Sequence, residues 1–246
     1  MPASPRAQRD SEKGLSVRKL GLIGGMSWVS TRTYYEHLNR IVQRRVGWQA
    51  SAPLLIESLD FAGLARLADD DAWEGAAQTL AESARRLEAA GAGALIIAAN
   101  SMHRVYDEVA AAVAIPIIHI ADTVGQRMAE RGVKTAALLG TSAVMTESFY
   151  RQRLVAHGIS LLPPDMDGIP AIEELIYDDL MREKASRTAE RACKTWITHQ
   201  SQDGAQAIVL ACTELEMVVD VDANVLPIYD GTRIHAEAAA DWILGD

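Results

Sequence analysis

The stretch 207–214, which reads Ala-Ile-Val-Leu-Ala-Cys-Thr-Glu, constrains the fold of this chain more than any other. Its five apolar residues include β-branched Ile208 and Val209, and such a run is typical of a strand buried on both faces of a parallel sheet. The strand ends abruptly at Cys212 and two polar residues. Because ligands of open α/β sheets bind beyond the carboxyl ends of the strands, we expect chemistry at Cys212.

Residues 92–103 repeat this pattern of an apolar strand followed by small polar residues. Superposing the two stretches places Ala99 on Cys212 and aligns Asn100 and Ser101 with the Thr-Glu pair. The repeat predicts that Ala99 and Cys212 lie at equivalent positions in two related halves.

A second pair of stretches supports the repeat. Residues 20–26 and 135–141 both read as an apolar strand that reaches a glycine. Gly24 precedes the alanine of the first half by 75 residues, and Gly140 precedes the cysteine of the second by 72. We therefore interpret the chain as one α/β unit used twice.

Strand and helix patterns alternate along the chain, which favours parallel sheets with helices outside. Strands are expected at 19–25, 53–59, 94–98, 116–119, 134–139, 158–162, 207–211 and 225–229. Helices are expected near 30–46, 69–90, 101–113, 121–131, 144–157, 168–181, 185–202 and 231–243. The predicted domains are a disordered leader (1–18), a first α/β domain (19–120 plus 225–246) and a second (121–224).

Charge and hydropathy narrow the class of protein. The net charge of −9 argues against a nucleic-acid surface. No apolar run approaches the roughly 20 residues that span a bilayer, so we expect no membrane partner. The first 19 residues lack the apolar core of a signal peptide, and we expect a cytoplasmic protein.

The remaining motifs predict neither a metal nor a cofactor. The two cysteines, Cys193 and Cys212, have no clustered histidines, which excludes a zinc signature, and Cys193 lies in a helical pattern typical of a buried thiol. Gly24-Gly25 follows a strand, but the full G-x-G-x-x-G pattern of a dinucleotide loop is absent.

Five motifs, in this order and spacing, together resemble the aspartate/glutamate racemase family and most of all its broad-specificity amino-acid racemase branch. They are Gly24-Gly25-Met26-Ser27-Trp28, Asn100-Ser101-Met102-His103, Leu138-Leu139-Gly140-Thr141, Cys212-Thr213-Glu214 and Ile234-His235-Ala236-Glu237. The resemblance covers residues 19–244. It implies two pseudo-symmetric α/β domains with an amino-acid or dicarboxylate substrate in the cleft between them, a reaction without a cofactor, and a homodimer.

The resemblance also implies residue roles. In the family one thiol lies on each side of the substrate Cα, so that one thiolate takes the α-proton while the other thiol delivers a proton to the opposite face. Cys212 is then one acid/base, and a helix start behind it is expected to lower its pKa from about 8.5. The implied substrate-binding residues are Met26, Ser27, Asn100, Ser101, Thr141, Thr213 and Glu214.

Two positions depart from the family pattern. Ala99 replaces the second thiol, and Ala68 stands where the branch has a polar glutamine. Three hypotheses remain open. The first is a racemase whose second proton comes from water, Ser101 or His103. The second is a single-thiol decarboxylase or isomerase, as in members similar to arylmalonate decarboxylase. The third is a non-catalytic binder of an amino acid or dicarboxylate.

Overall fold

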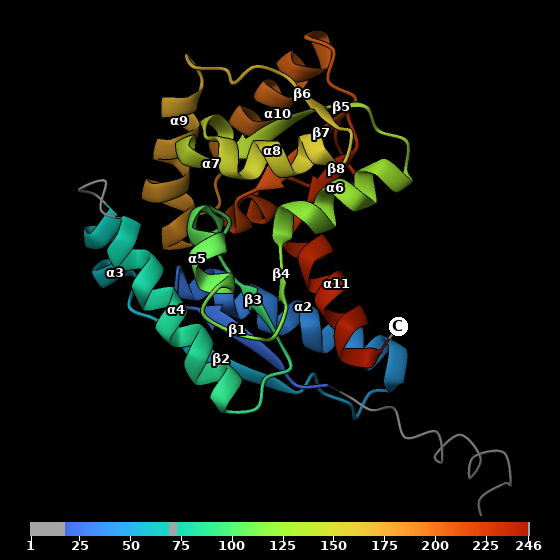
Figure 1. Ribbon diagram of the computed structural model, residues 1–246. Coiled ribbons are helices and arrows are strands. Elements are labelled where there is room, and N and C mark those ends of the chain that lie inside the picture. The colour runs from blue at the N-terminus through green and yellow to red at the C-terminus, as the bar shows by residue number, and fades with distance from the viewer. Residues whose placement is uncertain (1–17, 69–72, 246) are drawn as a thin grey trace, which may run out of the picture.

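Two lobes, each built around a four-stranded parallel sheet, make up the protein (Figure 1). The computed structural model describes residues 18–68 and 73–245. Nearly all of the predicted leader and the acidic run Asp69-Asp70-Asp71 lie outside the described residues. Within them, no helix is long and apolar enough to cross a membrane.

The first sheet has the strand order β2-β1-β3-β4. Its strands are β1 (Leu20–Gly24), β2 (Leu54–Ser58), β3 (Ala94–Ile97) and β4 (Ile117–Ile118). Its helices are α2 (Trp28–Val46), α3 (Phe61–Ala68), α4 (Trp73–Ala89), the 3-10 helix η1 (Ser101–Val105) and α5 (Tyr106–Ala110). Side chains alternate along β1, so Leu20 and Leu22 enter the core under α2 while Ile23 enters the core under α4.

The second sheet repeats the same order as β6-β5-β7-β8. Its strands are β5 (Thr135–Gly140), β6 (Ser160–Leu161), β7 (Ala207–Ala211) and β8 (Ile228–Asp230). The helices that follow or precede them are α6 (Ile120–Glu130), α7 (Ser142–Thr146), α8 (Ser148–Ala156), α9 (Ile169–Glu174), α10 (Arg187–Gln202) and α11 (Gly231–Leu244). Shorter turns are the π-helix η2 (Leu175–Asp179) and the 3-10 helices η3 (Leu180–Arg182) and η4 (Thr213–Met217).

The register of the two sheets confirms the repeat. Ile23 pairs with Ile97 in the first sheet, and Gly140 pairs with Ala211 in the second. Continuing each register by one or two residues brings Ala99 and Cys212 to equivalent places beyond β3 and β7. The prediction of two pseudo-symmetric parallel-sheet α/β domains is therefore confirmed.

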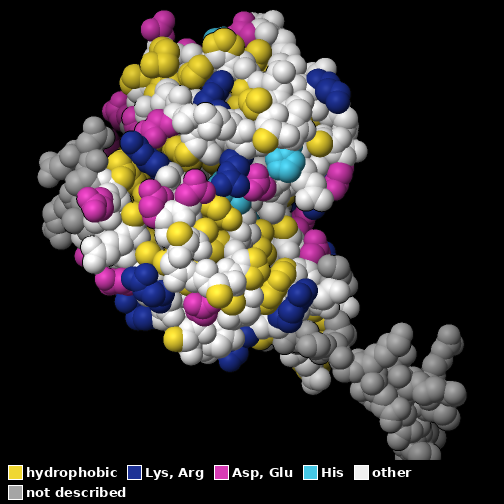
Figure 2. Space-filling model, in the orientation of Figure 1, with side chains coloured by type: hydrophobic (Ala, Val, Ile, Leu, Met, Phe, Trp, Pro, Cys, Tyr) yellow, Lys and Arg dark blue, Asp and Glu magenta, His cyan; other side chains and the backbone are white. Residues whose placement is uncertain are grey.

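The chain crosses between the lobes twice, from β4 into α6 and from β8 into α11. Strand β8 pairs with β7, so residues 228–230 belong to the second sheet, whereas our sequence analysis places them with the first domain. Helix α11 does join the first lobe, because Ala236 and Ala240 lie in the core under α2. Ion pairs also link the lobes along their junction, where charged side chains gather (Figure 2), as between Arg104 and Glu147 at 2.9 Å.

Three predicted helices are less regular than expected. The helix at 144–157 is interrupted at Glu147, whose backbone is extended (φ −81°, ψ 161°). The helix at 101–113 begins as the 3-10 turn η1, and the helix at 168–181 continues from α9 into η2 and η3. Wider π-helical turns often occur at functional sites, and this one borders the cleft.

Candidate active site

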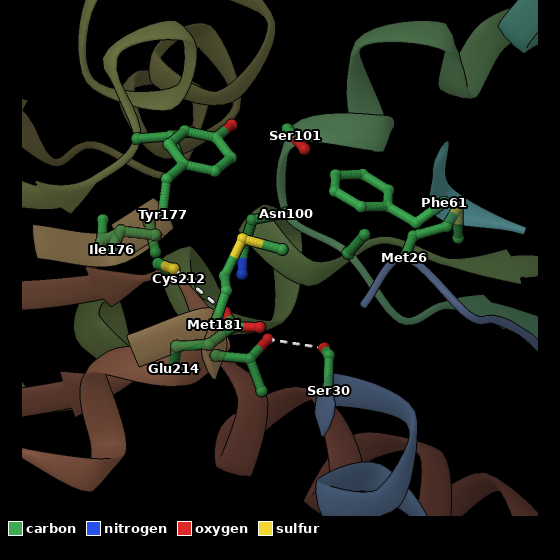
Figure 3. A pocket seen from close by; sticks show the side chains of 14 residues that line it. Met26, Ser30, Phe61, Asn100, Ser101, Ile176, Tyr177, Met181, Cys212 and Glu214 are labelled. Atoms are coloured by element: carbon green, nitrogen blue, oxygen red, sulfur yellow. Dashed lines mark hydrogen bonds between the residues drawn. The ribbon is translucent and has the colours of Figure 1, made fainter. Parts of the chain in front are cut away.

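A small cavity of about 40 Å³ lies between the lobes, beyond the carboxyl ends of the central strands (Figure 3). This volume is far below the roughly 300–1,000 Å³ typical of small-molecule sites. The lining residues are Met26, Ser30, Phe61, Ala99, Asn100, Ser101, Thr141, Ile176, Tyr177, Met181, Ala211, Cys212, Thr213 and Glu214.

Glycines directly precede two lining residues, Met26 after β1 and Thr141 after β5. Gly25 after β1 has φ +86°, and a Cβ there would lie 2.1 Å from the Leu59 carbonyl oxygen. At Gly140 a Cβ would lie 2.9 Å from the Ala211 oxygen. Close backbone packing therefore accounts for both glycines without a bound nucleotide.

The Cys212 side of the cavity is a buried hydrogen-bond chain. The Cys212 thiol donates to Glu214 Oε2 at 3.2 Å, and the Ser27 hydroxyl donates to Glu214 Oε1 at 2.7 Å. Glu214 is only 6% exposed, and neither of its two hydrogen-bond partners, Ser27 and Cys212, is a cation. The carboxylate is thus held between the two lobes with one oxygen against the thiol.

Burial raises the pKa of the Cys212 thiol well above its ordinary value, and the Glu214 carboxylate beside it adds to the rise. Backbone N–H groups of Glu214 and Leu215 act in the opposite direction but are outweighed. Our expectation of a lowered thiol pKa is therefore wrong. The helix start behind Cys212 is a 3-10 helix of five residues, and a carboxylate occupies the place where a cation would be needed.

The serine at the start of α2 ties Thr213 to the first lobe. Ser30 Oγ lies 2.8 Å from the Ala98 carbonyl oxygen and 2.8 Å from Thr213 Oγ1. Thr232 at the start of α11 lies 3.3 Å from the same threonine oxygen. These contacts fix the turn that carries Cys212 against the strand end that carries Ala99.

The Ala99 side has no ionisable group at the equivalent position. The Ala99 carbonyl oxygen instead accepts a hydrogen bond from His103 Nδ1 at 2.9 Å. With Nδ1 donating, His103 Nε2 is the acceptor for the Ile120 N–H, at 3.4 Å, where the chain enters the second lobe. Burial lowers the pKa of His103 to about 3, and the nearby His235 adds to the effect, so this ring is neutral.

Two buried polar atoms of the cavity have no hydrogen-bond partner among the described residues. They are Asn100 Oδ1 and Thr141 Oγ1, one from each lobe. Buried polar atoms are almost always satisfied in native proteins, so an unpaired pair beside a cavity indicates places for a polar ligand. Among the residues that the structure describes, no three His, Cys, Asp or Glu side chains are grouped to hold a metal ion.

The structure brings most of the predicted site residues together. Those that line the cavity are Met26, Ala99, Asn100, Ser101, Thr141, Cys212, Thr213 and Glu214. Ser27 is not among them and contacts the site through Glu214. Ala68 ends α3, and its side chain lies outside the described part of the structure. His103 faces the lobe junction rather than the cavity.

Sequence reasoning missed six lining residues: Ser30, Phe61, Ala211, Ile176, Tyr177 and Met181. The first three are one to three residues from a predicted site residue or a strand end, so their position along the chain offered a signal. The last three lie on η2 and η3, inside a segment that reads as an ordinary helix. No motif marks them.

Two parallel α/β lobes with a thiol, a carboxylate and unpaired polar groups in the cleft are the features of a racemase-type enzyme. The model of the Asp/Glu/hydantoin racemase family matches residues 23–239, and the chain belongs to this family. Known relatives agree with this assignment. The chain is 23% identical over 167 residues to the broad specificity amino-acid racemase RacX of Bacillus subtilis, covering 68% of this chain and 72% of RacX.

Solved structures show the same fold. A Yersinia pestis protein assigned to the Asp/Glu racemases superposes with a TM-score of 0.86 at 38% identity, covering 92% of this chain and 99% of that one. An aspartate racemase homologue from Pyrococcus horikoshii superposes with a TM-score of 0.81 at 26% identity, covering 93% of this chain and all of the other.

Proposed function

We propose that the chain is a cofactor-independent amino-acid racemase or epimerase in which Cys212 is the acid/base. The observation that carries this proposal is the hydrogen bond from the Cys212 thiol to the buried Glu214 carboxylate in the interlobe cavity. Membership of the racemase family supports the reaction class. The cytoplasmic location stays a prediction of the sequence, and the homodimer stays a prediction of the family resemblance.

The proton path begins at the thiol. Glu214 Oε2 accepts the Cys212 proton, and the thiolate that is left removes the α-proton of the substrate. Because the thiol pKa is raised, the thiolate is a strong base once it forms. The electron pair of the broken C–H bond then resides on the substrate, and Cys212 is again a thiol that can return a proton to the same face.

Fixed polar groups would bind the substrate and stabilise the carbanion-like charge. Asn100 Oδ1 suits the ammonium group, since an amide oxygen only accepts hydrogen bonds. The hydroxyl groups of Ser101, Thr141 and Thr213 suit the carboxylate, which gains charge in the transition state. The unpaired state of Asn100 Oδ1 and Thr141 Oγ1 supports these roles.

The second face of the substrate would meet Ala99, whose methyl group has no exchangeable proton. Both ring nitrogens of His103 are engaged with backbone groups away from the cavity, so this residue is a poor donor. Ser101 lines the cavity beside Ala99. We assign the second proton to Ser101 or to a water molecule that it orients.

A second candidate function follows from the methyl group at position 99. One thiol opposite a small apolar residue would also suit a decarboxylase or isomerase in which Cys212 protonates one face of a planar intermediate. Such an enzyme would release carbon dioxide from a malonate-type acid, or isomerise an unsaturated diacid, and would not interconvert enantiomers.

The test is exchange of the α-proton in deuterated water, followed by proton NMR for both enantiomers of a panel of amino acids. The proposal predicts exchange with inversion in the wild type and its loss in Cys212→Ala, with Cys193→Ala as a buried-thiol control. Inversion that persists in Cys212→Ala would remove Cys212 from the mechanism. Saturable binding without exchange or decarboxylation would instead identify a non-catalytic binder.

A further inference from the structure

The cavity has a polar end and an apolar end. The polar end holds Glu214, Asn100 and Thr141 around the thiol. The apolar end is lined by Met26, Phe61, Ile176, Tyr177 and Met181. Figure 3 shows Tyr177 and Met181 reaching inward from the second lobe, opposite Phe61 and Met26 of the first.

The charges around the cavity are of one sign. Among the lining residues that the structure describes, none is Lys, Arg or His, and the carboxylate is that of Glu214. Two arginines at the lobe junction pair with acidic side chains, Arg32 with Glu183 at 2.7 Å and Arg104 with Glu147 at 2.9 Å. A carboxylate on a substrate side chain would therefore find no cation among these lining residues.

Burying a charge without a partner is costly, whereas burying an alkyl or thioether group is favourable. A basic side chain fares no better in this part of the cavity. Both oxygens of Glu214 already accept hydrogen bonds, from Ser27 and Cys212, and they lie at the polar end.

We propose that the apolar end selects amino acids with a neutral, apolar side chain, such as leucine, norvaline or methionine, over aspartate, glutamate and lysine. The inference rests on the proposed racemase function and names its substrate class. Met181 is the main specificity-determining residue, because it lines the apolar end and its side chain points inward, across from Met26 and Phe61, in Figure 3.

The experiment measures kcat/KM for α-proton exchange with leucine, norvaline, methionine, aspartate, glutamate and lysine, together with calorimetric binding of each. We expect at least about tenfold higher values for the three apolar amino acids, which corresponds to burying about two methylene groups. Faster exchange of aspartate, glutamate or lysine would overturn the inference and leave the racemase function in place.

Absence of exchange with every amino acid would refute the racemase function instead. Binding then decides the side-chain preference: tighter binding of leucine than of aspartate supports it, and equal or weaker binding overturns it.

A charge-introducing variant tests the part that Met181 plays. Met181→Lys places a cation at the apolar end and is expected to raise the aspartate-to-leucine ratio of kcat/KM at least about tenfold. Met166→Lys is the matched control, because Met166 is an exposed methionine of the same lobe and its replacement adds the same charge outside the cavity. An unchanged ratio in Met181→Lys, or an equal change in the control, would contradict the role of Met181.

Discussion

The two halves of the site share a backbone and differ in chemistry. Beyond β7, the Cys212 thiol donates a hydrogen bond to a buried carboxylate, which takes its proton in the proposed mechanism. Beyond β3, at the equivalent position, Ala99 presents a methyl group, and a neutral histidine holds its carbonyl oxygen. The duplicated fold places the two positions alike, and in the proposed mechanism the side chain at each position determines which face of a substrate reacts.

The largest effect should come from removing the proton acceptor on the Cys212 side. Glu214→Gln keeps an acceptor for Ser27 but loses the carboxylate, so we predict about a 100-fold fall in α-proton exchange. The same change should lower the pKa of the Cys212 thiol, measured as the pH dependence of its alkylation, because a negative neighbour is gone.

Glu216→Gln is the matched control for this prediction. Glu216 lies two residues further along the same 3-10 helix, and its Oε2 is 3.1 Å from His37 Nε2, away from the cavity. If both variants slow exchange equally, the contact between Glu214 and the thiol has no special role.

The histidines behind Ala99 should make the protein sensitive to acid. Burial lowers the pKa of His103 to about 3 and of His235 to about 4, below the roughly 6.5 of an unfolded chain. The unfolded state therefore binds protons first, and stability present above pH 6.5 is lost as the pH falls toward 4. The charged or titratable neighbours that add to the effect at His103 are His235 and Arg153.

The expected loss is about 2 to 3 kcal/mol per histidine between pH 6.5 and pH 4, measured by urea unfolding at each pH. His103→Asn removes one of these groups, so the number of protons taken up on unfolding, given by the slope of stability against pH, should fall by about one. His199→Asn is the control, since His199 lies on α10 outside the cluster. A flat stability profile in the wild type would contradict the buried neutral state.

Restoring a thiol on the Ala99 side should make the halves more alike. Ala99→Cys places an exchangeable proton opposite Cys212, and we predict that racemisation rises about tenfold, followed by circular dichroism of the substrate. Ala99→Ser adds a hydroxyl of similar shape that is a much weaker acid, and it should give a smaller gain. No gain from either variant would mean that the second face is not limiting.

The smallest effect is expected at Ser27, which supports Glu214 from the first lobe. Ser27 caps α2 by accepting from the Ser30 N–H, so Ser27→Ala should cost about 1 kcal/mol of stability and slow exchange about fivefold. Ser186→Ala removes the corresponding cap of α10, where Ser186 accepts from the Ala189 N–H. It should cost similar stability without slowing exchange. Equal slowing in both would assign the effect to stability alone.

The fold and about half of the site residues could be predicted from the sequence, because both depend on local sequence patterns. Apolar runs that end at glycine, at cysteine or before asparagine predicted β1, β3, β5 and β7, and the repeat of those runs predicted the equivalence of Ala99 and Cys212. The raised pKa of Cys212 was not predictable in this way. It depends on where the Glu214 side chain turns and on burial between two lobes, which are tertiary properties.

The residues of η2 and η3 at the apolar end of the cavity could not be predicted from the sequence for a related reason. Ile176 and Met181 fit the pattern of an ordinary amphipathic helix, and only the wider π turn and its position at the lobe junction direct them to the cavity. Likewise, β8 is a short strand next to a crossing point, so its membership of the second sheet depends on pairing with β7 rather than on its own residues.

The most direct measurement compares the two enantiomers of one accepted amino acid in deuterated water, with NMR for exchange and chiral chromatography for inversion. The account predicts asymmetry. The enantiomer whose α-proton faces Cys212 exchanges at least about tenfold faster than it inverts, because the thiol trades the proton that it has removed for a solvent deuteron and returns that deuteron to the same face. The other enantiomer exchanges only as fast as it inverts. Equal ratios of exchange to inversion from both enantiomers would show two equivalent acid/base groups and contradict the account.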